Sequence, residues 1–156
     1  MVIRPIRPED EPAMVRFHGR LSDESVFLRY AGTLKLDARV AHRRLARICH
    51  VETDRELVLV ALEEGEIVAV ARLMRLPGVR RAEFALLVSD AMQGRGLGRA
   101  LLLRLIEAGR AWGLDQIVAE VLPGNARMRR LCGDLGFRFR GETGASLELR
   151  TARRGS

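Results

Sequence analysis

Apolar residues along the chain recur with two different periods, and the changes between them predict the secondary structure. Short runs that alternate or are continuously apolar indicate strands, because successive side chains of a strand point to opposite faces. We expect strands at residues 2–7, 56–62, 67–73, 82–88 and 115–122, and a pair of strands within residues 137–149. Spacings of three and four residues indicate helices. We expect helices at residues 9–21, 21–30, 37–48, 97–112 and 125–135.

The order of these elements predicts an α/β fold with a mixed central sheet flanked by helices. Residues 56–62 and 67–73 flank the turn sequence EEGE, which is typical of an antiparallel hairpin. The later strand–helix–strand unit, residues 82–122, instead requires a parallel pair joined by a right-handed crossover. No repeat, low-complexity tract or internal linker interrupts the pattern, so we expect a single domain over residues 1–156.

Composition narrows the classes of partner. The net charge of +7 favours an anionic partner, but aromatic residues make up only 4% and the basic residues are spread along the chain, which argues against a nucleic-acid surface. No apolar run is long enough for a leader peptide or a membrane span. Cys49, Cys132, His18, His42 and His50 show no spacing typical of a disulfide framework or a metal site. We therefore expect a cytoplasmic protein without a metal, a nucleic-acid partner or a membrane partner.

The segment QGRGLGR, residues 93–99, places three glycines between a predicted strand and a predicted helix. It does not match a dinucleotide-binding fingerprint, because Arg99 stands where the third glycine would fall, and the Gly-Lys-Ser/Thr of a P-loop is missing from the chain. A flexible turn is one interpretation of the glycines. The other is an anion site, because the first N–H groups of a helix are unpaired and the helix dipole favours negative charge. Arg95 and Arg99 would add positive charge to such a site.

The same segment carries a resemblance to a known family. Gln93-Gly94-Arg95-Gly96-Leu97-Gly98 resembles the Q/R-x-x-G-x-G/A signature of the GNAT superfamily of N-acetyltransferases. Residues 120–137, EVLPGNARMRRLCGDLGF, resemble that family's strand, Asn-led helix and terminal Gly-Phe. The N-terminal half, including IRPIRPEDE and LSDESVFLRY, is similar to the acetyltransferase domain of bacterial Pat-type protein lysine acetyltransferases. The resemblance implies a GNAT fold, with antiparallel N-terminal strands and one parallel pair at the cofactor site.

The resemblance also implies that acetyl-CoA is the co-substrate. Its pyrophosphate would be bound by the loop and the start of the helix, through Gln93, Gly94, Arg95, Gly96, Leu97, Gly98 and Arg99. Pantetheine would pair with the backbone of Leu86, Leu87 and Val88, where one N–H would stabilise the oxyanion of the reaction. Asn125 has two expected roles, capping its helix and binding pantetheine. Arg129, one helical turn further, is expected to reach the cofactor phosphates or to lie on a solvated face.

Acetyl transfer to an amine benefits from a base, because only the neutral amine attacks and the pKa of lysine is about 10.4. The resemblance places Glu83 at the position of the Pat-type base, and Glu120 at the position of a base used elsewhere in the superfamily. Glu120 stands in an otherwise apolar strand, where an unpaired carboxylate would be costly to bury. We predict Glu83 as the base and Glu120 as its helper or substitute. Cys132 occupies the place of a tyrosine that often protonates the leaving thiolate, so the general acid is left unassigned.

These residues predict transfer of an acetyl group from acetyl-CoA to a lysine of a protein substrate. The amine would attack directly in a ternary complex, because no residue resembles an activated Ser or Cys nucleophile. The Pat-type resemblance implies that the substrate is an AMP-forming acyl-CoA synthetase. Two alternatives stay open: N-acetylation of a small amine such as an antibiotic, polyamine or amino acid, and an inert acyl-CoA-binding sensor.

Overall fold

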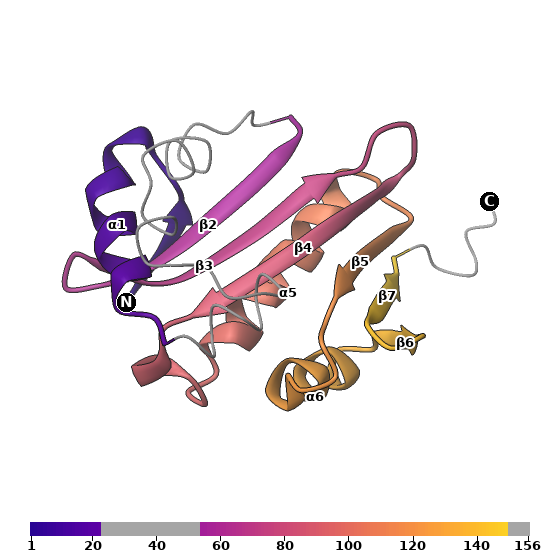
Figure 1. Ribbon diagram of the computed structural model, residues 1–156. Coiled ribbons are helices and arrows are strands. Elements are labelled where there is room, and N and C mark those ends of the chain that lie inside the picture. Colours follow the sequence, from indigo (N-terminus) through magenta and orange to yellow (C-terminus); the bar gives the residue numbers. More distant parts are fainter. Residues whose placement is uncertain (23–53, 150–156) are drawn as a thin grey trace.

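The computed structural model describes residues 1–22 and 54–149, which form one sheet with helices packed against it (Figure 1). In these residues seven strands lie in the order β1-β2-β3-β4-β5-β7-β6. The strands are β1 (Val2–Pro5), β2 (Glu56–Glu63), β3 (Glu66–Arg75), β4 (Arg81–Val88), β5 (Gln116–Glu120), β6 (Arg138–Arg140) and β7 (Gly144–Glu148). The helices are α1 (Glu11–Gly19), α5 (Leu97–Ala111) and α6 (Ala126–Asp134), with short 3-10 turns at η1 (Pro8–Asp10) and η2 (Asp90–Met92).

The predicted mixed sheet is confirmed. Strands β4 and β5 form the parallel pair, and the other neighbouring strands in the described residues are antiparallel. The predicted N-terminal helix starts as the 3-10 turn η1 and becomes an α-helix only at Glu11. The helices predicted at residues 21–30 and 37–48 fall almost wholly outside the described residues. None of the described helices is long and apolar enough to cross a membrane.

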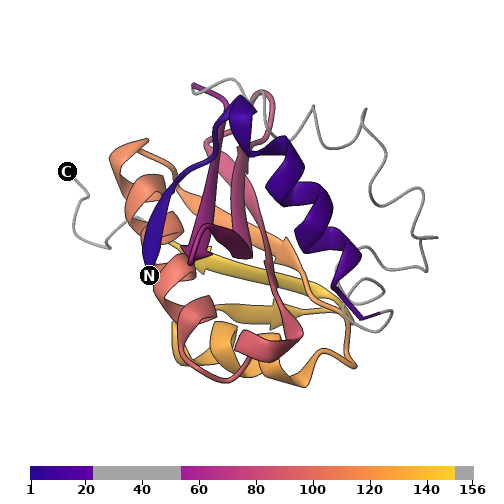
Figure 2. The same cartoon turned by 90° about the vertical axis from the view of Figure 1, so that its left-hand side faces the viewer.

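The two faces of the sheet carry separate apolar cores. Alternate residues of β4 show the division: Ala82, Phe84 and Leu86 pack into the cluster that includes the apolar side of α5, while Leu87 packs into the cluster beneath α1. Figure 2 shows α1 and α5 on opposite sides of the sheet. Because side chains alternate along a strand, Glu83 shares the face of Leu87 and lies opposite to α5.

Strands β4 and β5 are paired over only part of their length. Their parallel register runs from Arg81 opposite Gln116 to Glu83 opposite Val118, whereas β4 continues to Val88. Beyond Glu83 the two strands diverge toward the end at which α6 lies (Figure 1). This divergence opens a gap in the middle of the sheet, beside the end of β4.

The N-terminal strand is tied to the chain before α1 by one carboxylate. Two nitrogens of Arg4 donate to the two oxygens of Asp10, both at 2.9 Å, and the backbone N–H of Arg7 donates to Asp10 at 2.7 Å. Asp10 is itself buried. The hydrogen bond from Arg4 is the main reason why the pKa of Asp10 lies below its usual value.

Replacing Asp10 with asparagine should lower the free energy of unfolding at neutral pH by about 1.5–3 kcal/mol, the range for a hydrogen bond to a charged group. Because the folded-state pKa is lowered, the carboxylate stabilises the fold above its unfolded pKa of about 3.9, and this contribution is lost as the pH falls through the folded-state value. Urea unfolding should therefore show the variant and the wild type converging as the pH falls. Glu9→Gln, at the exposed neighbouring acid, is the control. A deficit of equal size at every pH would contradict this assignment.

Candidate active site

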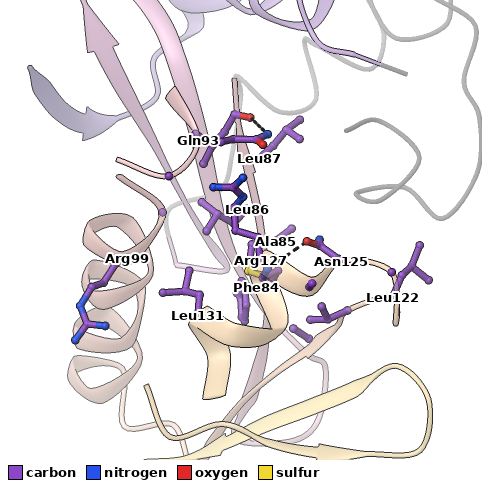
Figure 3. Close-up of a pocket in the computed structure, with 18 of the residues that line it drawn as sticks. Phe84, Ala85, Leu86, Leu87, Gln93, Arg99, Leu122, Asn125, Arg127 and Leu131 are labelled. Atoms are coloured by element: carbon purple, nitrogen blue, oxygen red, sulfur yellow. Dashed lines mark hydrogen bonds between the residues drawn. The ribbon is translucent and has the colours of Figure 1, made fainter. Parts of the chain in front are cut away.

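The gap between β4 and β5 is a cavity of about 790 Å³ (Figure 3). Its walls come from the end of β4 beyond its pairing with β5, the following loop, the start of α5, the end of β5 and the start of α6. The volume lies within the usual range for small-molecule and cofactor sites, about 300–1,000 Å³. The predicted site residues that line it are Glu83, Leu86, Leu87, Val88, Gln93, Gly94, Gly96, Gly98, Arg99, Glu120 and Asn125.

The glycine loop brings backbone N–H groups to one side of this cavity. Gly94 and Gly96 have φ of +80° and +82°, in the left-handed region that favours glycine. Gly96 is the N-cap of α5, and no side chain caps the helix there. The first helical N–H groups therefore lack intrahelical partners, and with the helix dipole they form an anion-binding geometry. Gln93 fastens the loop to β4 by donating from Nε2 to the carbonyl of Val88 at 3.1 Å (Figure 3).

Arg127, which the sequence analysis did not single out, lies on α6 and reaches the loop from the other side of the cavity. Its guanidinium stands where a side chain on Gly94 would be, because a Cβ there would lie 2.9 Å from Nη1. Within the described ranges, the Arg127 side chain has no hydrogen bond or ion pair. Its five N–H donors are therefore free for a ligand, and they add positive charge opposite the unpaired N–H groups of α5.

Two predicted loop residues do not line the cavity. Arg95 turns back onto the preceding 3-10 turn, with its Nη1 3.1 Å from the sulfur of Met92. Leu97 is buried in the core on the α5 side of the sheet. A contact of Leu97 with the cofactor is then left to its backbone N–H at the start of the helix, and the expected contacts of both residues stay predictions.

Arg129 also lies outside the cavity wall and holds the C-terminal hairpin. Its Nη1 donates to the carbonyls of Val121, at 2.9 Å, and Glu142, at 3.2 Å. Its guanidinium stacks on the ring of Phe139, 4.5 Å from the centroid. These contacts tie α6 to the end of β5 and to the β6–β7 turn. Of these two arginines of α6, Arg127 lines the cavity and Arg129 does not, and the expected contact of Arg129 with the cofactor phosphates stays a prediction.

Asn125 begins α6 at the edge of the cavity. Its Oδ1 accepts a hydrogen bond from the backbone N–H of Met128 at 3.2 Å (Figure 3), so its predicted role as a helix cap is confirmed. The amide nitrogen of Asn125 has no partner among the described residues and lies at the cavity wall. Its predicted contact with pantetheine stays a prediction.

Glu83 and Glu120 lie where this first cavity meets a second one. Since Glu83 is paired with Val118, Glu120 lies two residues further along the same face of the neighbouring strand. Both acids line the first cavity, and both line a second cavity of about 990 Å³ that runs over β5, β7 and β6. A molecule held in either cavity therefore meets the same pair of carboxylates.

The surroundings of Glu120 differ from the expectation. The apolar residues around Glu120 predict a carboxylate that is costly to bury, but Glu120 is exposed because β5 ends at this residue and β4 has already diverged. Glu83 is half-buried. The residues that the structure describes contain no group of three His, Cys, Asp or Glu side chains placed to hold a metal ion.

Cys132 is sealed in the core and does not line the first cavity. Burial raises the pKa of its thiol to about 11, so the reactive thiolate is scarce in the folded protein. We predict that a Cys49→Ser variant, which keeps Cys132 as its single thiol, reacts with a thiol reagent at least about a hundredfold more slowly when folded than when unfolded in urea. Equal labelling rates in the two states would contradict a sealed thiol.

Comparison with known proteins identifies the family. Residues 23–137 match the model of the acetyltransferase (GNAT) family. An acetyltransferase of Pseudomonas aeruginosa is 30% identical over 141 residues, which cover 88% of this chain and 74% of that protein. The GNAT domain of S. lividans PAT matches with a TM-score of 0.85 at 30% identity, over 94% of this chain and 89% of that one. The yncA protein of Salmonella typhimurium, solved with its cofactor acetyl-CoA, has a TM-score of 0.69 at 26% identity, over 97% and 95%.

Two further relatives are matched over smaller shares of their own length. Acetyltransferase Pat of Mycolicibacterium smegmatis is 29% identical over 137 residues, which are 86% of this chain and 40% of Pat. An L-methionine sulfoximine/L-methionine sulfone acetyltransferase of Salmonella typhimurium is 39% identical over 84 residues, 51% of this chain and 49% of that protein. The family match spans most of the chain, and it agrees with the observed sheet and glycine loop. The chain belongs to the GNAT family of acetyltransferases.

Proposed function

We propose that this protein transfers the acetyl group of acetyl-CoA to the side-chain amine of a lysine in a protein substrate. The observation that carries the proposal is the meeting of two cavities at Glu83 and Glu120, one with an anion-binding loop and one open along the sheet. This arrangement suits a donor and an acceptor that are bound together, with carboxylates between them. The likeness to Pat supports a protein acceptor. An AMP-forming acyl-CoA synthetase in the cytoplasm is the acceptor that we expect.

The first cavity suits acetyl-CoA. The N–H groups at the start of α5, together with Arg99 and Arg127, would bind the pyrophosphate. Residues 86–88 of β4 are paired with β3 but not with β5, and their open edge would hold the pantetheine arm, with the amide of Asn125 beside it. The likeness to yncA, which was solved with acetyl-CoA, supports this choice of donor.

The chain's own groups would handle the amine, while acetyl-CoA supplies an activated thioester. Glu83 would accept the proton of the lysine ammonium, directly or through water, and the neutral amine would then attack the thioester carbonyl. A backbone N–H of β4 would donate to the developing oxyanion. The C–N bond forms first and gives a tetrahedral intermediate, whose collapse breaks the C–S bond and releases CoA as the thiolate. The second proton of the attacking nitrogen is released to water as the amide forms. Cys132, buried away from the cavity, is not placed to form an acyl-enzyme.

A second candidate is acetylation of a small amine. The match to the L-methionine sulfoximine acetyltransferase favours it, at 39% identity over 84 residues. The second cavity favours the larger acceptor, because it extends from the two acids across β7 to the edge strand β6.

The two candidates are separated by supplying the protein with acetyl-CoA and, in parallel reactions, acyl-CoA synthetases, unrelated proteins and free amino acids. We expect mass spectrometry to find acetyl-lysine in a protein, with release of an equal amount of CoA. Acetylation of free amines alone would replace the proposal with the second candidate. Binding of acetyl-CoA without any transfer would identify an inert acyl-CoA sensor.

A further inference from the structure

The second cavity carries opposite charges at its two ends. Glu83 and Glu120 line the end that meets the first cavity, and Arg138 and Arg140 of β6 line the other end. Phe139, between the two arginines, packs toward α6. Because side chains alternate along a strand, Arg138 and Arg140 face the opposite side of the sheet, which is the side of the two acids.

The strand register sets the distance between these ends. Glu120 pairs with Gly144, and Gly144 pairs with Arg140, so the acid and the arginine are two strand spacings apart, about 10 Å. Gly144 has no side chain, and Ser146 takes the corresponding place in the row of Arg138. The carbonyl of Arg140 lies where a side chain on Gly144 would be, 2.7 Å from an ideal Cβ, so the floor at this row is backbone. The cavity above it, about 990 Å³, leaves room for an extended segment.

The charges at both ends are free to bind a ligand. Within the described part of the chain, the side chains of Glu83, Glu120, Arg138 and Arg140 have no hydrogen bond or ion pair. Arg138 and Arg140 are also exposed.

The remaining charges of the cavity lie at a third row and oppose one another. Arg81 pairs with Gln116, which pairs with Glu148. The Nε2 of Gln116 donates to the Glu148 carboxylate. This row has the reverse order of charge, with Arg81 on the β4 side and Glu148 on the β7 side, and Glu148 is already engaged by Gln116. The charge separation of the cavity therefore comes from Glu83 and Glu120 facing Arg138 and Arg140.

We propose that this groove selects a lysine that has an aspartate or glutamate next to it in the acceptor protein. The inference rests on the proposed lysine acetyltransferase function. The ammonium would lie at Glu83 and Glu120, and the neighbouring carboxylate would lie at Arg138 and Arg140, whose guanidinium groups bind carboxylates in bidentate fashion.

Geometry favours a peptide over a free amino acid in this groove. An extended lysine side chain spans about 6 Å from Cα to Nζ, and the following backbone and acidic side chain cover the remaining distance to the arginines. A free α-amino acid carries its amine and carboxylate on one carbon, so it cannot reach both ends of the groove when its α-amine is the acceptor.

The test compares two peptides that differ only in having Asp or Asn beside one lysine. We expect wild-type kcat/KM to be about tenfold to a hundredfold higher for the Asp peptide, mainly through a lower KM, and this preference to shrink as salt is added. The Arg138→Gln/Arg140→Gln double variant should bring the Asp peptide down to the level of the Asn peptide. Arg130→Gln, at an exposed arginine of α6 outside both cavities, should keep the preference.

Two other outcomes would contradict the groove's selectivity alone or the proposed function together with it. Equal turnover of both peptides by the wild type, or a preference that survives in the double variant, would overturn the groove's selectivity and leave lysine acetylation standing. No acetylation of either peptide, with transfer to free amino acids, would overturn the proposed function and this inference together.

Discussion

Replacing Glu83 with glutamine should lower kcat for acetyl transfer by about 10²–10⁴-fold at neutral pH, with little change in the affinity for acetyl-CoA. Glutamine keeps the shape and reach of the side chain but removes the carboxylate that would accept the amine proton. Glu83 lies at the junction of the two cavities, in a part of β4 that is paired with strands on both sides. The substitution therefore changes the chemistry without freeing the strand.

The pH dependence of that loss identifies its cause. As the pH approaches the lysine pKa of about 10.4, more acceptor arrives as the free amine, and the gap between Glu83→Gln and the wild type should narrow. Glu120→Gln is the matched control, because Glu120 lies on the same face at the end of the neighbouring strand. We expect it to show the smaller loss. A larger loss in Glu120→Gln would exchange the two roles, and near-wild-type rates in both variants would exclude a carboxylate base.

Replacing Gly96 with aspartate should weaken the binding of acetyl-CoA by about tenfold to a hundredfold. The new carboxylate would face the pyrophosphate. Two like charges about 4 Å apart repel by about 1 kcal/mol when fully hydrated and by about 4 kcal/mol when partly buried. A Cβ on Gly96 would meet nothing within 4 Å, so the substitution causes no clash. The φ of +82° strains any side chain at this position, but aspartate accepts a positive φ better than most residues.

Gly96→Asn is the control for this substitution, since it has the same size and the same capping ability without the charge. Calorimetry should show acetyl-CoA binding to the asparagine variant more tightly than to the aspartate variant, and the difference should shrink in high salt. S-acetyl-pantetheine, which lacks the pyrophosphate, should not distinguish the two. Equal affinity of both variants for acetyl-CoA would contradict a phosphate site at the start of α5.

The helices and strands could be predicted because the period of apolar residues reports which side of an element is buried. Leu97, Leu101 and Leu105 recur at helical spacing, and all three are buried on the side of α5 that faces the sheet. The divergence of β4 and β5 could not be predicted in this way. It depends on where pairing between two distant segments ends, after Glu83 and Val118, and periodicity within either strand carries no record of that point.

The glycine loop and Asn125 could be predicted from local sequence, whereas the role of Arg127 could not, because it depends on contacts between distant segments. The glycine loop and the Asn125 cap are local signals, because a helix start needs free N–H groups and a capping oxygen within a few residues. Arg127 and Arg129 are both within the first turns of α6, but at about 100° per residue they point about 200° apart. Only the packing of α6 against the hairpin, through Arg129 and Phe139, decides which of them faces the cavity.

Direct transfer at the junction of the two cavities is tested most directly by following the acetyl group through a single turnover. The measurement uses acetyl-CoA labelled in its acetyl group, a lysine peptide, and a Lys35→Arg variant, which contains no lysine of its own. We expect rapid quenching and mass spectrometry to show that the label passes from acetyl-CoA to the lysine Nζ, with none attached covalently to the protein at any time. Label held covalently by the protein before the peptide is added, or a peptide that never becomes labelled, would contradict direct acetyl transfer.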